Sequence, residues 1–203
     1  MKKKDLASTK EDKLELKENT ISSEHVFDGT LLQVYVDDVK LPDGSHSTRD
    51  WIKHPGASAV VPVFQDGSIM LLKQYRYPPR KLFLEVPAGK IDAGETPKTT
   101  ALRELEEESG LSCDNLEQVG SLFPAIGYAD EEIFVYVGWG LSQSDKQTDD
   151  DEFLINHKLH FSDALKMIES GEIKDGKTIC ALTQTYFWWK THEPFPIDFD
   201  NAS

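Results

Sequence analysis

The chain contains 203 residues, enough for one large or two small domains with a hydrophobic core. Its 36 aspartate and glutamate residues outnumber 22 lysine and arginine residues, so the formal net charge is −14. A chain this acidic repels polyanions, and we therefore expect no nucleic-acid partner and no binding to an anionic membrane. Any phosphate group must be bound locally, most simply through divalent cations held by some of the carboxylates.

The cysteine content and the hydropathy indicate a soluble, cytoplasmic protein. Cys113 and Cys180 are too few for a disulfide framework, and they lack the spacing of zinc sites. Acidic residues interrupt the segment that follows Met1, so no apolar run typical of a signal peptide is present there. No stretch approaches the roughly 18 consecutive apolar residues of a membrane span.

The N-terminal quarter of the chain indicates a tail followed by a small sheet. Residues 1–20 are rich in charged and poor in apolar side chains, so we expect a flexible tail. Residues 21–55 indicate an antiparallel β-meander, with strand-like runs at 25–27, 31–36 and 48–53. Three short strands can hardly bury a face alone, so the meander must pack on the rest of the chain or on another subunit.

Residues 56–192 alternate between strand and helix patterns, which predicts a mixed sheet flanked by helices, an α/β or α+β sandwich. The helix at 97–109 has the clearest ends, because Thr96 and Pro97 are typical start residues and Gly110 is a typical stop. The expected strands are 57–64, 68–74, 82–86, 117–123, 133–138 and 153–160, and the other expected helices are 162–169, capped by Ser162, and 177–191. A polar loop is expected at 142–151, and residues 193–203 form a C-terminal tail without an assigned role.

Three glutamates on the helix at 97–109 carry the main chemical signal. Glu104, Glu107 and Glu108 stand at i, i+3 and i+4, so their carboxylates project from one face within a single turn. Like charges in this arrangement destabilise a helix unless something compensates them, and carboxylate oxygens suit the hard cations Mg²⁺ and Mn²⁺. The alternative is a solvated acidic helix face. Arg103 precedes the triad and can orient a carboxylate through its fork of donors.

The surrounding segment resembles the signature of the Nudix hydrolases. That signature is Gly, five residues, Glu, seven residues, and then Arg-Glu-apolar-x-Glu-Glu-x-Gly-apolar. The matching residues are Gly89, Glu95, Arg103, Glu104, Leu105, Glu107, Glu108, Gly110 and Leu111, without a departure. The match covers 23 residues in a strand–loop–helix context, which favours the metal site over the solvated helix face.

The resemblance implies a Nudix fold, an α/β/α sandwich with a mixed sheet, whose catalytic domain is residues 56–192. It also implies hydrolysis of a nucleoside diphosphate linked to a further moiety, with two to three Mg²⁺ or Mn²⁺ ions per site. The implied metal ligands are Glu104, Glu107, Glu108 and the backbone carbonyl of Ala88. Glu107 and Glu108 are expected to be catalytic, whereas Gly89, Glu95, Arg103 and Gly110 are structural residues of the motif.

Three segments outside this motif resemble the ADP-ribose and nucleoside diphosphate sugar pyrophosphatase branch of the Nudix hydrolases. These are Arg49–Ala57, Lys73–Tyr77 and Leu84–Gly89. That branch exchanges its N-terminal meander between the subunits of a homodimer, so we expect a homodimer with a small-molecule nucleotide substrate. In the branch, the residue matching Arg76 contacts the diphosphate and the residue matching Arg49 reaches across the dimer.

Aromatic side chains hold the base in this branch, and Phe27 and Trp51 are the candidates here, with Glu85 as a further substrate-binding candidate beside the motif. Each of these residues has a structural alternative. Both aromatic rings could simply pack in the meander, and Glu85 could point outward from its strand. Arg49 could be a solvated charge at a sheet edge. Arg76 could stack on neighbouring surface tyrosines.

One departure from the branch concerns the substrate. Ile126 stands where the ADP-ribose branch usually has a proline, fifteen residues after the motif. Other nucleoside diphosphate sugars, GDP-mannose among them, therefore stay open beside ADP-ribose. Outside this branch, a dinucleoside polyphosphate or a nucleoside triphosphate is an alternative substrate, and a non-catalytic nucleotide-binding module is an alternative function.

The acidic run from Asp149 to Glu152 lies where the branch keeps a loop with a base that activates water. The spacing before the apolar pair Phe153-Leu154 aligns Asp150 with that base and Glu152 with a further metal-linked acid. Both are expected to be catalytic residues. The alignment of this acidic run with the branch is open by one residue, and we assign Glu152 ahead of Asp150. The alternative is a loop that only adds solubility.

Overall fold

The computed structural model describes residues 16–144 and 153–199, which form two compact units. The first unit contains residues 16–54 and 125–130, and the second contains 55–124, 131–144 and 153–199. In the described residues, no helix is long and apolar enough to cross a membrane.

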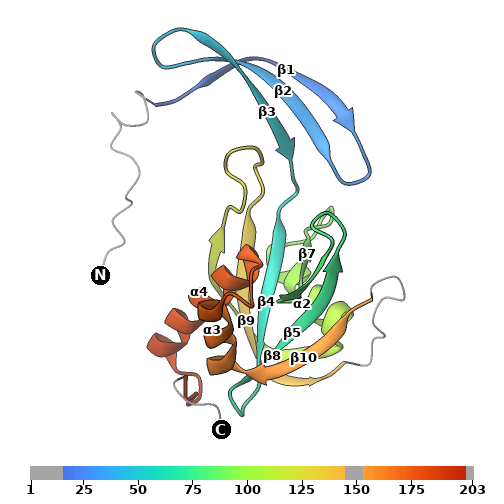
Figure 1. Cartoon of the computed structure of the whole chain (residues 1–203), viewed down its shortest axis with the longest axis vertical. Helices are drawn as coiled ribbons and strands as arrows, with labels where there is room; N and C mark the ends of the chain where they lie inside the picture. Colours follow the sequence, from blue (N-terminus) through green and yellow to red (C-terminus); the bar gives the residue numbers. More distant parts are fainter. Residues whose placement is uncertain (1–15, 145–152, 200–203) are drawn as a thin grey trace. The chain divides into compact units, whose positions relative to one another are not determined.

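The first unit is built on an antiparallel three-stranded sheet (Figure 1). Its strands are β1 (Asn19–Asp28), β2 (Gln33–Lys40) and β3 (His46–Lys53), in the order β1-β2-β3. Every residue of β1 is exposed, as expected for an edge strand of a sheet this small. The segment 125–130 joins β3, because the Ile52 amide donates to the Tyr128 carbonyl at 2.8 Å.

The second unit contains a mixed seven-stranded sheet in the order β10-β5-β4-β9-β8, with β6 paired to β5 and β7 paired to β4. Its strands are β4 (Ala57–Val63), β5 (Ser68–Arg76), β6 (Lys81–Glu85), β7 (Ala88–Lys90), β8 (Leu111–Leu122), β9 (Ile133–Gln143) and β10 (Ile155–His160). Strands β4 and β9 run parallel, whereas the other pairs are antiparallel. Every residue of β4 is buried, so this strand lies at the centre of the unit.

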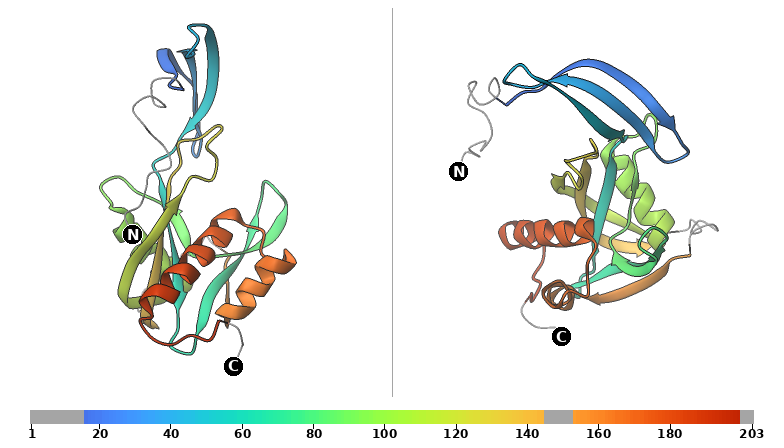
Figure 2. Two further views of the ribbon diagram at one scale, coloured as in Figure 1. Left: turned by 90° about the vertical axis from the view of Figure 1, so that its left-hand side faces the viewer. Right: turned by 45° about the horizontal axis from the view of Figure 1, so that its top comes forward.

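Helices cover both faces of this sheet (Figures 1 and 2). The helices are α2 (Pro97–Ser109), α3 (Phe161–Ser170) and α4 (Gly176–His192). Successive side chains of β4 point to opposite faces: Val61 packs with α3 and α4 in one core, and Val60 packs with α2 in the other. The unit is therefore an α/β/α sandwich, as predicted.

Several element boundaries differ from the sequence-based expectation. β1 starts at Asn19, and β8 starts at Leu111, directly after the end of α2. β9 continues to Gln143, because its pairing with β8 extends to that residue, so the polar loop starts later than expected. The cap of α3 is His160 rather than Ser162, since the His160 ring accepts from the Ser162 amide at 3.3 Å.

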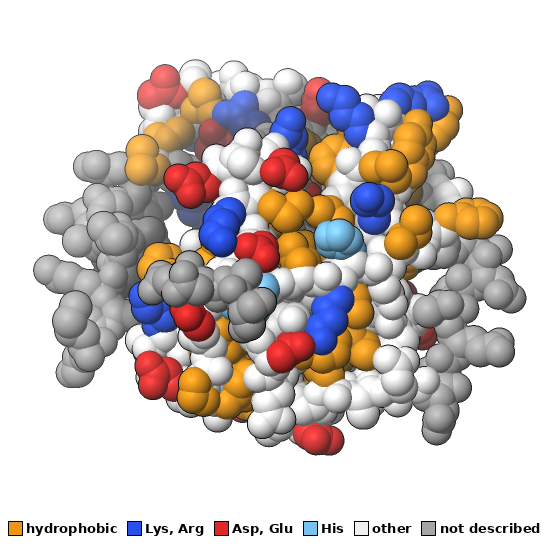
Figure 3. Space-filling model, turned by 60° about the horizontal axis from the view of Figure 1, so that its bottom comes forward, with side chains coloured by type: hydrophobic (Ala, Val, Ile, Leu, Met, Phe, Trp, Pro, Cys, Tyr) orange, Lys and Arg blue, Asp and Glu red, His pale blue; other side chains and the backbone are white. Residues whose placement is uncertain are grey.

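The surface of the molecule mixes charged and apolar side chains. On the face drawn in Figure 3, acidic, basic and apolar groups are interspersed rather than gathered into areas of one kind. On that face, the excess of acidic residues does not produce one large anionic patch.

Candidate active site

Helix α2 carries the predicted glutamate triad, and local interactions fix both of its ends. The Thr96 hydroxyl accepts from the Thr99 amide at 3.2 Å, which satisfies one of the otherwise unpaired amides of the first turn. Gly110 adopts a left-handed conformation with φ 69°, and its amide donates to the Glu106 carbonyl at 2.9 Å. The helix therefore begins and ends where the sequence predicts.

The three glutamates lie at the buried side of α2 or beside it. Glu104 and Glu108 are 9% and 8% exposed, and Glu107 is half-buried. Ala101 and Leu105 hold the same helix against the sheet, and both are fully buried. Two carboxylates are thus kept out of solvent by the packing of their own helix, which requires partners for their charges.

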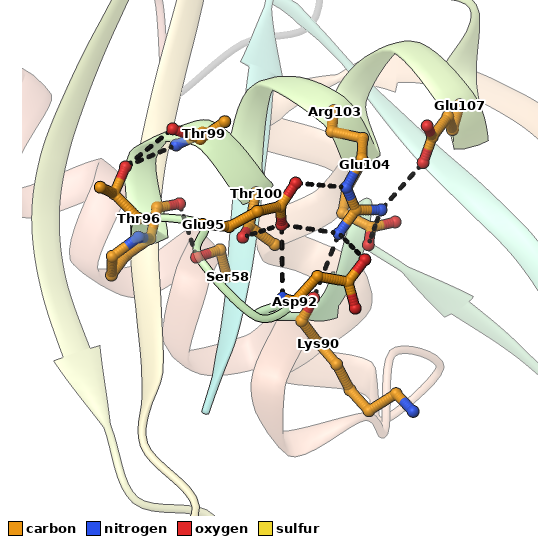
Figure 4. A network of polar contacts seen from close by, with 11 residues as sticks. Ser58, Lys90, Asp92, Glu95, Thr96, Thr99, Thr100, Arg103, Glu104 and Glu107 are labelled. Carbon is orange, nitrogen blue, oxygen red and sulfur yellow. Dashed lines mark hydrogen bonds and ion pairs between the residues drawn. The ribbon is translucent and has the colours of Figure 1, made fainter. Parts of the chain in front are cut away.

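Arg103 supplies much of that compensation (Figure 4). Its Nη1 group donates to Glu104 Oε1 at 2.7 Å and to Glu107 Oε2 at 2.9 Å. Its Nε group donates to Glu95 Oε1 at 3.0 Å, and Nη2 donates to the Lys90 carbonyl at 3.1 Å. One guanidinium therefore orients three carboxylates and ties the loop before α2 to the helix.

Glu95 forms a strong ion pair with Arg103 in this network. The hydrogen bonds from Arg103, and then the one from the Thr100 hydroxyl at 2.7 Å, lower the pKa of Glu95 to about 2. In the same pair, the hydrogen bonds that Arg103 donates to Glu95 are the largest cause of the raised pKa of Arg103. Glu95 and Arg103 therefore stay charged across the physiological range and act as a structural ion pair.

Strand β7 brings the backbone to the helix. The Ala88 amide donates to Glu108 Oε2 at 2.7 Å, so the main chain itself positions one carboxylate of the triad. A Cβ atom at Gly89 would overlap the Glu104 carboxylate. Glycine at this position therefore leaves room for the Glu104 carboxylate against β7, which explains this position of the motif in steric terms.

A second charged cluster lies at the ends of β5 and β6. Glu85 is 4% exposed and accepts two hydrogen bonds from Arg76, at 2.8 Å from Nε and 2.7 Å from Nη2. Lys177 Nζ, from the first turn of α4, lies 3.2 Å from Glu85 Oε2. The bonds to Glu85 are the largest cause of the raised pKa of Arg76, and the charge of Glu108 adds to it. The structure thus brings the predicted residues Arg76 and Glu85 together.

Comparison with known proteins identifies the family. Residues 53–182 match the NUDIX domain, and residues 18–52 match the nucleoside diphosphate sugar hydrolase N-terminal domain. The chain belongs to the Nudix family. The predicted recognition and the predicted fold are therefore confirmed, and the chain is an enzyme, a Nudix pyrophosphohydrolase.

Individual proteins are similar to this chain over most of its length. An ADP-ribose pyrophosphatase of Bacillus subtilis is 42% identical over 169 residues, which are 82% of this chain and 91% of that protein. A methanol dehydrogenase activator of Bacillus methanolicus is also 42% identical, over 81% of this chain and 90% of that protein. The solved structure of an ADP compounds hydrolase has the same fold, with a TM-score of 0.78, 22% identity, and coverage of 88% of this chain and 97% of that one.

Nudix hydrolases generally need divalent cations, and the donor set on α2 fits such an ion in kind. The carboxylates of Glu104, Glu107 and Glu108 offer oxygen donors, which hard cations prefer. Among residues 16–144 and 153–199, however, no three His, Cys, Asp or Glu side chains are placed to hold an ion together. In this arrangement Arg103 engages Glu104 and Glu107, while the Ala88 amide engages Glu108.

Three of the predicted substrate-binding residues lie in the N-terminal unit. Arg49 pairs with Glu18, with Nε 2.8 Å from Oε2, rather than extending into solvent unpaired. The Trp51 ring stacks on Tyr35, with ring centroids 5.0 Å apart, so one of its faces is occupied by the sheet itself. Phe27 is 55% exposed. These roles stay predictions.

The remaining predicted positions are the two acidic residues of the run 149–152 and Ile126. Asp150 and Glu152 lie outside the described residues, so their catalytic roles also stay predictions. Ile126 is 83% exposed.

The start of α4 was predicted at Lys177, but its contact with the predicted residue Glu85 was not. Asp175 caps the helix by accepting from the Thr178 amide at 2.9 Å, and the Thr178 hydroxyl accepts from the Val86 amide at 3.0 Å. The spacing of Asp175 and Thr178 is a local capping signal that could have been noticed. That Lys177 reaches a residue 92 positions away could not have been inferred locally.

Proposed function

We propose that this Nudix enzyme hydrolyses the diphosphate bond of ADP-ribose or a related nucleoside diphosphate sugar. Water adds across one phosphorus–oxygen bond of the bridge, giving a nucleoside monophosphate and a sugar phosphate. With ADP-ribose the products are AMP and ribose 5-phosphate. The observation that carries the substrate class is the match of residues 18–52 to the N-terminal domain of nucleoside diphosphate sugar hydrolases, and the Bacillus subtilis relative favours ADP-ribose within it.

Glu104, Glu107, Glu108 and the Ala88 carbonyl would hold two to three Mg²⁺ or Mn²⁺ ions. Such ions neutralise the diphosphate and lower the pKa of the attacking water. Support comes from the concentration of three carboxylates within one helical turn, two of them almost buried. Arg103 is attached to Glu95 as well as to the triad, so it stays in place when a cation competes for Glu104 and Glu107.

Residues outside the metal site would bind the substrate. Arg76 carries a charged donor group that Glu85 orients through two hydrogen bonds, and we assign it to the diphosphate. Phe27 and Trp51 are assigned to the base, and Arg49 to the substrate of the other subunit. The exposed ring of Phe27 and the accessible position of Arg49 support these assignments.

We also propose a homodimer in which residues 21–55 form the dimerisation unit and residues 56–192 the catalytic domain. The three-stranded sheet supports this, because β1 is exposed along its whole length and Ile21, Val26 and Phe27 are all about half exposed. Light scattering of the full chain is expected to give twice the monomer mass. A monomeric mass at micromolar concentration would contradict the dimer without affecting the assignment of the reaction.

The test of the reaction is product analysis with purified protein in Mg²⁺, in Mn²⁺ and in excess chelator. The substrate panel contains ADP-ribose, GDP-mannose, a diadenosine polyphosphate and a nucleoside triphosphate. Release of a nucleoside monophosphate and a sugar phosphate, lost in chelator, supports the proposal. If only the diadenosine polyphosphate or the nucleoside triphosphate is cleaved, the proposed substrate class is wrong. If no substrate is cleaved, the proposed reaction is wrong.

A further inference from the structure

Glu85 is a buried anion shared by two cationic side chains that differ in exposure to solvent. The side chain of Glu85 is 5% exposed, while that of Arg76 is 43% exposed and that of Lys177 is 14% exposed. A carboxylate this deeply buried requires a permanent counter-charge. The enclosed Lys177 can supply it in every state of the enzyme, whereas the exposed Arg76 is free to respond to a ligand.

The donor groups of Arg76 also indicate that it can bind a ligand. Nε and Nη2 of Arg76 are engaged by Glu85. In the described part of the chain, no partner is assigned to Nη1, so this group is the donor left for an external anion. Glu85 therefore orients Arg76 and at the same time competes with any anionic ligand for its charge.

Lys177 is held firmly on the opposite side of Glu85. Its Nζ atom lies 3.2 Å from Asp175 Oδ2, the cap of α4, as well as 3.2 Å from Glu85 Oε2. The fully buried Thr178 ties the same turn to the Val86 amide at 3.0 Å. The start of α4 is thus fixed to the chain segment that follows Glu85, and Lys177 cannot move away without breaking that contact.

We propose that Lys177 is a positioning residue for diphosphate binding: by neutralising Glu85 from the buried side, it leaves the charge of Arg76 available to the substrate. This inference rests on the proposed function, which assigns Arg76 to the diphosphate. The charges explain the effect. Arg76, Lys177, Glu85 and Asp175 sum to zero, whereas without Lys177 the cluster carries a net negative charge beside the place where a polyanion binds.

The test compares Lys177→Met with the wild type and with Lys166→Met. Lys166 lies on α3 and pairs with Asp163 on the surface, so its substitution removes the same charge from the same unit away from the cluster. For Lys177→Met we expect KM for ADP-ribose to rise by about 10-fold while kcat changes by less than about 3-fold. Lys177→Arg is expected to keep KM near the wild-type value, and so is Lys166→Met.

A double variant shows whether Lys177 acts through Glu85. Adding Glu85→Gln to Lys177→Met removes the uncompensated charge, so KM is expected to fall back toward the wild-type value relative to Lys177→Met alone. A purely structural role of Lys177 predicts a lower melting temperature with unchanged KM, and that outcome would overturn the proposal. So would an equal KM in Lys177→Met and the wild type, or no recovery in the double variant. If Lys177→Met does not fold, Lys177→Gln takes its place in the same comparison.

Binding of inorganic pyrophosphate in chelator, measured by calorimetry, separates this inference from the proposed function. If the wild type cleaves no nucleoside diphosphate sugar but binds pyrophosphate, and Lys177→Met weakens that binding about 10-fold, Lys177 has the assigned role and the proposed reaction is wrong. If the sugar nucleotides are cleaved and Lys177→Met binds pyrophosphate as the wild type does, the reaction stands and the role of Lys177 falls.

Discussion

The Ala88 amide donates a hydrogen bond to Glu108 Oε2 at 2.7 Å, although the two residues lie 20 positions apart. This contact joins the strand and the helix that together form the Nudix motif. The donor is a backbone amide, so a substitution of the Ala88 side chain leaves this hydrogen bond intact. A shift of β7 would break it. The activity should therefore depend strongly on the spacing between β7 and α2.

Gly89→Ala tests that spacing. The added Cβ overlaps the Glu104 carboxylate, so Glu104 or β7 must move, and we expect kcat/KM to fall by about 10²-fold or more while the fold is kept. The measurement is steady-state hydrolysis together with a thermal melt. Gly176→Ala is the matched control, because a Cβ there meets nothing within 4 Å, and its activity should equal that of the wild type. Wild-type activity of Gly89→Ala would show that Glu104 is not needed in its present position.

Glu95→Gln tests the ion pair with Arg103 through pH. The pKa of Glu95 is lowered from 4.5 to about 2, so its stabilising contribution is complete above about pH 4.5 and is lost as the pH falls toward 2. In chelator, the variant should unfold at lower urea concentration than the wild type at pH 6, and this difference should shrink at pH 3. Glu117→Gln, at an exposed position of β8, controls for the loss of one negative charge. A difference that grows as the pH falls would contradict the pairing.

Thr178→Val tests the attachment of α4. The fully buried Thr178 hydroxyl accepts from the Val86 amide at 3.0 Å and donates to Asp175 at 2.6 Å. Valine keeps the shape but leaves a buried amide unpaired, so the free energy of unfolding should fall by about 1–3 kcal/mol in chemical denaturation.

Thr183→Val is the control for that substitution. The Thr183 hydroxyl donates only within α4, to the Ile179 carbonyl at 2.7 Å, so its loss should cost less than that of Thr178. Equal losses in the two variants would mean that the Val86 contact contributes nothing.

Local signals in the sequence explain which parts of this structure could be predicted. The bounds of α2 and the common face of Glu104 and Glu108 follow from capping residues and from the helical period, both of which act over a few residues. The central strand β4 was recognisable as a continuous β-type run. The short strand β7 was not, because three residues that include Gly89 give no periodic pattern.

Long-range contacts account for what sequence reasoning missed. The contact of Lys177 with Glu85 depends on how α4 packs against the ends of β5 and β6, and no local pattern encodes that packing. The same holds for Trp51, whose stacking on Tyr35 depends on the register between β2 and β3. The position of Arg103 between Glu104 and Glu107 depends on the loop before α2, because that loop carries Glu95.

We infer that the carboxylates of α2 drive hydrolysis of a nucleoside diphosphate sugar, and Glu108→Gln removes one of these charges. The matched control is Glu106→Gln on the same helix, which removes one negative charge outside the triad. With ADP-ribose and Mg²⁺, we expect the wild type and Glu106→Gln to release AMP at similar rates, and the rate of Glu108→Gln to be lower by about 10²-fold or more. Equal rates in Glu108→Gln and the wild type would contradict it.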